Sequence, residues 1–309
     1  MSRALVIGSR GSKLALWQAD QARQRLLELN PQVDVRIEII KTTGDVKNDP
    51  LSVIGGKGVF TKELEDALLD RRIDLAVHSL KDLPTVLPDG LSISAICERE
   101  DARDALVLRT NVEIEHASLA GLPVGAVVGT SSQRRLSQLK ALRSDVVVTD
   151  LRGNVDTRIR KLDEGQYDAV ILATAGLVRL GLQARISARI SVAEMLPAVG
   201  QGAVAIETRR DNEFAVEATR KLDHQETRLA CLAERSFLRS LGGGCQFPIA
   251  AHAIIDGDSL KLDGLVARPD GSKILRDSLS GPLVDAEVLG SQLAEQLLQQ
   301  GARSLLNVL

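Results

Sequence analysis

One thiol follows three glycines in the segment 241–249, LGGGCQFPI. Glycine adopts backbone angles that other residues avoid, so the run predicts a tight loop, and the apolar alternation that begins at Phe247 predicts a strand after it. Cys245 is then either a reactive group on a loop or a small apolar residue packed into the interior, and the local sequence leaves both open. A reactive thiol needs an exposed, electropositive setting.

Cationic side chains supply such a setting elsewhere in the chain. They lie on loops, or on the first turns of helices, that follow predicted strands: Arg10, Lys57, Lys81, Arg134, Arg135, Arg152, Arg158 and Arg179. Open α/β sheets bind ligands beyond the carboxyl ends of their strands, and guanidinium groups pair with carboxylates through two hydrogen bonds. The pattern indicates a cleft for a small molecule with several acid groups. The alternative is a scatter of solvated surface charges, the usual position of Lys and Arg.

The composition limits the class of protein. The chain has 309 residues, a net charge of -2, 44% hydrophobic and 2% aromatic residues, which is ordinary for a globular protein and unlike a nucleic-acid binder. Cys97, Cys231 and Cys245 are widely spaced and form no CxxC motif, and the histidines show no metal-ligand spacing. We expect a reduced, cytoplasmic protein without a metal, a signal peptide or a membrane span.

Alternating strands and helices must position these residues. Apolar runs predict strands at 4–7, 33–40, 75–77, 91–96, 105–108, 124–128, 146–149, 169–172 and 204–207. Helices are predicted between them, the first over 13–29 with Ser12 as its N-cap, and the segment 213–240 reads as largely helical. Strands at 249–255, 259–267 and 273–280 and a helix over 285–300 follow. Two α/β regions therefore precede an α+β tail that carries Cys245.

Seven motifs resemble the porphobilinogen deaminase (hydroxymethylbilane synthase) family, in the family's order and over nearly the whole chain. They are IGSRGSKLALWQ at 7–18, GGKGVF at 55–60, VHSLKD at 77–82, GTSSQRR at 129–135, LRGNV at 151–155, LPAVGQG at 196–202 and GGCQFP at 243–248. The resemblance implies an α/β fold of three domains. Two are lobes of the periplasmic-binding-protein type, residues 1–99 with 198–220 and residues 100–197, and the third is a smaller α+β domain, 221–309, with a three-stranded antiparallel sheet.

The resemblance also implies a transferase of porphyrin and heme biosynthesis. Such an enzyme joins four porphobilinogen molecules head to tail, with loss of ammonia, onto a dipyrromethane cofactor, and hydrolysis then releases the tetrapyrrole hydroxymethylbilane. The cofactor is expected on Cys245 through a thioether. The enzyme is expected to act as a monomer on its small-molecule substrate, without nucleic acid or a membrane.

Matching positions assign the expected roles. Asp82 and Lys81 are expected in catalysis, where Asp82 would stabilise positive charge on the pyrrole nitrogen. With Cys245, the expected cofactor-binding residues are Ser79, Lys81, Asp82, Thr130, Ser132, Arg134 and Arg135. The expected substrate-binding residues are Arg10, Ser12, Gln18, Lys57, Arg152, Arg158, Arg179 and Gln201.

Alternatives remain at this point. Without the resemblance, Asp82 reads as a turn residue before Pro84. Gln133 and Asp156 depart from the family's usual pattern, and Asp156 adds a negative charge near Arg152 and Arg158. A non-enzymatic two-lobed binding protein for a small polycarboxylate would also account for the cations and the lobes. It would leave the Gly-Gly-Cys loop and the third domain unexplained.

Overall fold

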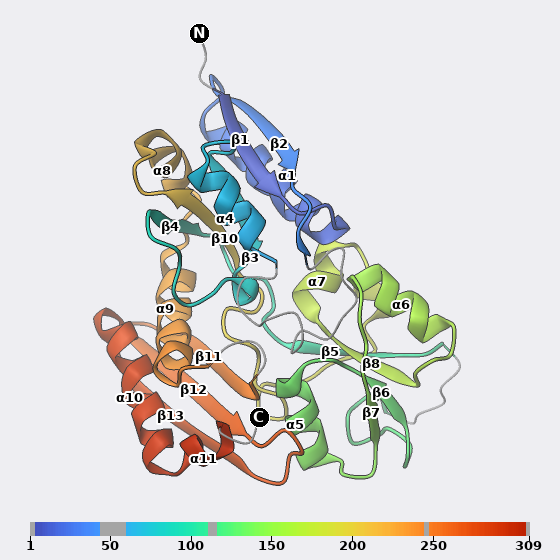
Figure 1. Cartoon of the computed structure of the whole chain (residues 1–309). Helices are drawn as coiled ribbons and strands as arrows, with labels where there is room; N and C mark the ends of the chain where they lie inside the picture. The colour runs from blue at the N-terminus through green and yellow to red at the C-terminus, as the bar shows by residue number, and fades with distance from the viewer. Residues whose placement is uncertain (1–3, 44–59, 111–115, 244–246, 307–309) are drawn as a thin grey trace. The chain divides into compact units, whose positions relative to one another are not determined.

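A computed structural model describes residues 4–43, 60–110, 116–243 and 247–306 (Figure 1). The predicted site residues Lys57 and Cys245 lie outside these ranges. Contacts within the chain divide it into two compact units: Met1–Glu100 with Ala203–Leu229, and Asp101–Gly202 with Ala230–Leu309. The three domain boundaries expected from the sequence stay a prediction.

The first unit is built on a five-stranded sheet in the order β2-β1-β3-β10-β4. Strands β1 (Ala4–Ser9), β2 (Asp34–Ile39) and β3 (Leu75–Ser79) are parallel, and β10 (Val204–Arg209) lies antiparallel between β3 and β4 (Leu91–Ile96). The helices are α1 (Lys13–Leu29), α4 (Lys62–Leu69) and α8 (Glu213–Arg220). The strand that returns from the distant segment therefore completes the sheet of the first lobe.

Helix α1 has the bounds that its sequence predicts. The Ser12 hydroxyl accepts a hydrogen bond from the Ala15 amide at 3.3 Å and so satisfies one of the free amides of the first turn. Ala15, Ala19, Ala22 and Leu26 are buried at intervals of three or four residues. This apolar face packs on Leu5 and Ile7 of β1. The helix begins four residues after the carboxyl end of that strand.

The second unit contains another five-stranded sheet, in the order β7-β6-β8-β5-β9. Strands β6 (Val127–Gly129), β7 (Val147–Thr149) and β8 (Ala169–Ala173) are parallel, whereas β5 (Asp104–Leu108) runs antiparallel to both β8 and β9 (Ala188–Arg189). The helices after the parallel strands are α5 (Gln133–Leu142), α6 (Val155–Asp163) and α7 (Thr174–Arg179).

The rest of the second unit is α+β. Helix α9 (Gln225–Ser240), which enters this unit at Ala230, precedes an antiparallel sheet of β11 (Ile249–Asp256), β12 (Ser259–Ala267) and β13 (Ile274–Pro282). Helices α10 (Ala286–Gln299) and α11 (Ala302–Leu306) follow. A Cβ on Gly264 of β12 would lie 2.8 Å from Phe237 of α9 and 2.9 Å from Leu293 of α10, so both helices cover one face of the sheet. Leu265 and Ala267 pack with Leu196 on the other face. The predicted fold class, two α/β lobes with a smaller α+β domain, is confirmed.

Most predicted bounds lie within two residues of the structure, and two elements differ from it by more than that. Strand β6 begins at Val127 instead of Val124, because the Ala126 amide donates to the Pro123 carbonyl and Gly125 has a φ of 76°, which makes a turn there. The helical segment 213–240 is two helices, separated at 221–224. No helix within the four described ranges is long and apolar enough to cross a membrane.

Candidate active site

A short turn after β3 presents two adjacent charged residues. The 3₁₀ turn Leu80–Asp82 is fixed by the Leu80 amide, which donates to the Ala203 carbonyl at 3.0 Å, and by the Leu83 amide, which donates to the Leu80 carbonyl at 3.2 Å. Leu80 and Leu83 are buried, whereas Lys81 is half-buried and Asp82 is exposed. The apolar residues therefore anchor the turn, and the charged residues point away from the core.

The same edge of the first sheet brings Gln18 and Ser79 together. Gln18 is buried on α1, and its Nε2 donates to the Ser79 hydroxyl at 3.0 Å. Arg10 lies on the loop after β1, where its guanidinium carbon is 4.3 Å from the centre of the Phe60 ring. Ser12 caps α1 beside it. All of the predicted site residues of the first unit that the structure describes thus follow β1, end or follow β3, or lie on α1.

A buried ionisable cluster lies directly under this edge, and the sequence analysis did not identify it. His78 Nε2 is 3.1 Å from Glu207 Oε2, and both side chains are buried. Burial raises the pKa of nearby Glu65, and the negative charge of Glu207 adds to that effect. Because His78 immediately precedes Ser79, this cluster supports the strand end that carries the turn.

In the second unit, the carboxyl ends of β6, β7 and β8 meet at one edge of the sheet. Thr130 and Ser132 follow β6, and the Ser132 amide donates to the Thr130 hydroxyl at 3.2 Å. Arg134 and Arg135 lie in the first turn of α5, and their exposed fractions are only 4% and 5%. The two guanidinium groups therefore belong to the interior of the lobe and are not scattered surface cations.

Both arginines bind Asp104, a fully buried residue that the sequence analysis did not select. Arg134 Nη1 is 2.7 Å from Asp104 Oδ2, and Arg135 Nη2 is 2.8 Å from Asp104 Oδ1. Burial alone would raise the pKa of Asp104, but the charges of Arg134 and Arg135 outweigh burial and hold it well below its ordinary value. Burial lowers the pKa of Arg134, although the Asp104 carboxylate opposes that effect.

Gln201 is directed at the same carboxylate. Its Nε2 donates to Asp104 Oδ1 at 2.9 Å and to the Ala102 carbonyl at 2.7 Å, and the residue is 1% exposed. These contacts fasten the loop 196–202 to the start of β5.

The other three predicted arginines of this unit are half-buried and contact nearby groups. Arg152 Nε donates to Asp150 Oδ2 and Arg158 Nε donates to the Gly153 carbonyl, each at 2.7 Å. Arg179 Nη2 donates to the Gly202 carbonyl at 2.6 Å. They come from the loop after β7, from α6 and from α7, and these contacts hold each one near its own loop. The predicted convergence of all the cations on one cleft involves both units and stays a prediction.

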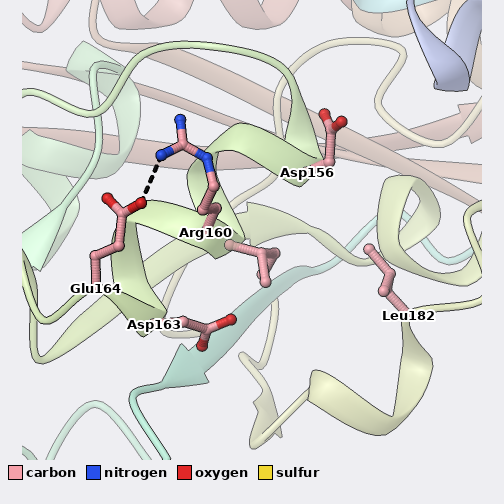
Figure 2. A pocket seen from close by; sticks show the side chains of 6 residues that line it. Asp156, Arg160, Asp163, Glu164 and Leu182 are labelled. Atoms are coloured by element: carbon pink, nitrogen blue, oxygen red, sulfur yellow. Dashed lines mark hydrogen bonds and ion pairs between the residues drawn. The ribbon is translucent and has the colours of Figure 1, made fainter.

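A hollow of about 410 Å³ on α6 has the wrong charge for a polycarboxylate. Figure 2 shows Asp156, Asp163 and Glu164 around it, with Arg160 turned toward Glu164, to which it donates at 2.5 Å. The carboxylates outnumber the single cation in its lining, so we do not assign the substrate to this hollow. The departure at Asp156 belongs to this acidic surface.

Known proteins resemble the chain in two ways. Solved structures that are similar to the chain include the VFT2 domain of Bordetella pertussis BvgS as a double mutant (16% identity over 72% of this chain and 85% of that one, TM-score 0.42). They also include the BenM effector-binding domain with benzoate (13%, 71% and 91%, TM-score 0.43) and an arginine-specific periplasmic binding protein of Salmonella typhimurium (13%, 72% and 92%, TM-score 0.40).

Family models match most of the chain. Residues 5–217 match the model described as "Porphobilinogen deaminase, dipyromethane cofactor binding domain", and residues 228–299 match "Porphobilinogen deaminase, C-terminal domain". The second match accounts for the α+β domain that a two-lobed binding protein leaves unexplained, so the binding-protein alternative is dropped. The chain belongs to the porphobilinogen deaminase family, the transferases that use a dipyrromethane cofactor to build hydroxymethylbilane from porphobilinogen.

Proposed function

We propose that Asp82 is the catalytic carboxylate of this deaminase and that Cys245 carries its cofactor. The observation that carries the proposal for Asp82 is its position on the turn Leu80–Asp82, where buried Leu80 and Leu83 leave the carboxylate exposed.

The reaction sets the task of the carboxylate. In each addition, the aminomethyl C–N bond of porphobilinogen breaks, ammonia leaves, and the methylene carbon joins a pyrrole carbon, which loses its proton. Positive charge develops on the pyrrole nitrogen as ammonia departs, and a fixed carboxylate stabilises that charge. Lys81, next to Asp82, binds a carboxylate side chain of the dipyrromethane cofactor. When bound, dipyrromethane supplies the pyrrole carbon to which the first substrate is joined.

The described residues of the second unit suit the acid arms of that cofactor. Arg134 and Arg135 carry two positive charges and Asp104 carries one negative charge, so the buried cluster keeps a net charge of +1. The hydroxyls of Thr130 and Ser132 lie just before these arginines. Hydroxyls and an uncompensated guanidinium charge are the groups that bind a carboxylate. With Ser79, Lys81 and Asp82 of the first unit, they form the proposed cofactor-binding set.

The remaining cations are proposed to bind the substrate and the growing chain. These residues are Arg10, Ser12, Gln18 and Lys57 in the first unit and Arg152, Arg158 and Arg179 in the second. Gln201 was also predicted to bind substrate, but its contacts with Asp104 and Ala102 support an indirect role. From the family, the chain is proposed to act as a cytoplasmic monomer on a small molecule. The net charge of -2 and the scarcity of aromatic residues argue against a nucleic-acid or membrane partner.

Intact mass tests the cofactor assignment. The purified active chain should be heavier than its sequence by two pyrrole units, and Cys245→Ser should lack this adduct and be inactive. Cys97→Ser is the control, because it removes a different, half-buried thiol, and it should keep both adduct and activity. An active wild-type chain with the bare mass of its sequence would rule the assignment out.

A further inference from the structure

The Asp104 carboxylate accepts hydrogen bonds from three residues of the proposed site. Its Oδ1 accepts from Arg134 Nη2 at 3.2 Å, from Arg135 Nε and Nη2 at 3.1 and 2.8 Å, and from Gln201 Nε2 at 2.9 Å. Its Oδ2 accepts from Arg134 Nη1 at 2.7 Å. Arg134 is thus held end-on by both carboxylate oxygens, whereas Arg135 is held from its side.

The topology of the sheet explains how one residue reaches all three. Strand β5 is antiparallel to β8, so its first residue, Asp104, is paired with Ala173, the last residue of β8. The start of β5 therefore lies at the edge where the three parallel strands end. Helix α5 and the loop 196–202 both reach this edge, as the bonds from Arg134, Arg135 and Gln201 to Asp104 demonstrate.

Further bonds limit the freedom of the two guanidinium groups. Arg134 Nη1 also donates to the Leu196 carbonyl at 2.7 Å, and Arg135 Nη1 donates to the Ile171 carbonyl at 2.8 Å. Two like charges this close repel each other, and Asp104 is the carboxylate between them. Without it, each side chain would have to move away from the other.

We propose that Asp104 is a positioning residue, which fixes Arg134 and Arg135 so that the pair offers one uncompensated positive charge to one carboxylate of the cofactor. The inference rests on the proposed role of the two arginines in cofactor binding. Gln201 then acts through Asp104, because its amide hydrogens are used on Asp104 and Ala102.

The alternative is that Asp104 only stabilises the lobe, and an aspartate at the other end of the strand pair β5 and β8 provides a control. This residue, Asp168, lies just before β8, at the opposite end of that strand from Ala173. It contacts Arg109 at 3.3 Å and accepts from the Val127 amide at 2.9 Å. Asp168→Asn should weaken the same sheet without touching Arg134 or Arg135.

The test asks how much the bound cofactor stabilises each chain. The cofactor stays attached to the unfolded chain but makes its non-covalent contacts only in the folded state, where they raise Tm. The difference in Tm between the loaded chain and its Cys245→Ser counterpart therefore reports those contacts. We expect Asp104→Asn to reduce this difference to about half or less, whereas Asp168→Asn should preserve it even if both substitutions lower Tm. In the loaded fraction, kcat of Asp104→Asn should fall at least about tenfold, and Asp104→Glu should recover part of it.

Other variants separate the possible failures. If Asp104→Asn gives too little folded chain, Gln201→Met is the substitute, because it removes one hydrogen bond to Asp104 without changing the charge of the cluster. The cofactor-dependent rise in Tm should shrink in that variant. An undiminished rise in either variant overturns the inference. Arg134→Leu and Arg135→Leu test the proposed function itself: if both keep the full rise, the arginines do not bind the cofactor.

Discussion

His78 Nε2 and Glu207 Oε2 lie 3.1 Å apart in the interior of the first unit, on the neighbouring antiparallel strands β3 and β10. Their exposed fractions are 5% and 0%. His78 is followed directly by Ser79 and by the turn Leu80–Asp82, so the pair holds the last residues of β3 against a strand from the distant segment. The turn that we propose as catalytic therefore follows a strand end that is held by a contact across 129 residues of sequence.

Glu207→Gln should destabilise the protein by about 1–3 kcal/mol, because a buried hydrogen bond to an ionisable partner is replaced by a weaker one. Urea unfolding followed by circular dichroism measures the change. Glu217→Gln is the control, since Glu217 pairs with Arg220 on an exposed helix face and surface pairs contribute at most about 1 kcal/mol. Equal effects of the two substitutions would show that the buried pair has no special importance.

Glu65→Gln should stabilise the protein more at pH 8 than at pH 5. Burial raises the pKa of Glu65, and the charge of Glu207 raises it further, so the folded chain releases the Glu65 proton at a higher pH than the unfolded chain does. Stability contributed by this proton is present below the unfolded pKa, about 4.3, and is lost as the pH rises through the higher folded pKa. Glutamine does not titrate, so the variant does not lose this stability as the pH rises. Thermal unfolding of both chains between pH 5 and 8 measures it, and a constant difference in Tm would contradict the prediction.

Local sequence signals were sufficient for most of the elements. Helix α1 and strand β4 have the predicted bounds, because a cap, an apolar period and a terminating Pro31 specify α1, and an apolar run between turns specifies β4. The predicted start of β6 was wrong because Pro123 to Ala126 form a turn, in which Gly125 has a positive φ, and the strand begins only after it. No local signal could place β10 antiparallel between β3 and β4, since that depends on pairing between distant segments.

The sequence predicted those candidate site residues that lie within the seven motifs, and missed Asp104, which lies outside them. The turn at Leu80–Asp82 and the residues of α5 were selected from segments that follow strands. Asp104 was missed because it precedes the apolar run 105–108 that predicts the strand, whereas antiparallel pairing with β8 brings it into contact with Arg134 and Arg135. An Arg-Asp-Ala start to a buried strand was the available signal, because an acid at the end of an apolar strand needs a cationic partner.

Arg152, Arg158 and Arg179 should act at different stages of chain growth. With limiting porphobilinogen, intact mass should reveal enzyme species that carry successive single-pyrrole additions, and each leucine substitution should change which species accumulates. The three side chains start from different loops and hold different carbonyl or carboxylate groups, so their loss is not equivalent. Arg160→Leu is the control, because Arg160 lies on the same helix as Arg158 but pairs with Glu164 beside the acidic hollow. A uniform weakening at every stage by all three variants would contradict separate roles.

Asp82→Asn should fold normally, retain the two-pyrrole adduct and turn over at least about 100-fold more slowly. The substitution keeps the shape of the side chain but removes the negative charge that we propose stabilises the pyrrole nitrogen as ammonia leaves. Asp82 is exposed, and the anchors of its turn are Leu80 and Leu83, so loss of the charge should not loosen the turn. Asp82→Glu keeps the charge but moves it by one methylene, and should retain part of the activity.

Single-turnover release of ammonia separates this chemical effect from weaker substrate binding, and Tm of the same preparations separates it from unfolding. Asp89→Asn is the matched control, because Asp89 is also an exposed aspartate on a loop of the first unit, and it should behave as wild type. If Asp82→Asn released ammonia at the normal rate, or lost activity only in proportion to the fraction unfolded, Asp82 would be a turn residue before Pro84 and the catalytic carboxylate would have to be sought elsewhere in the chain.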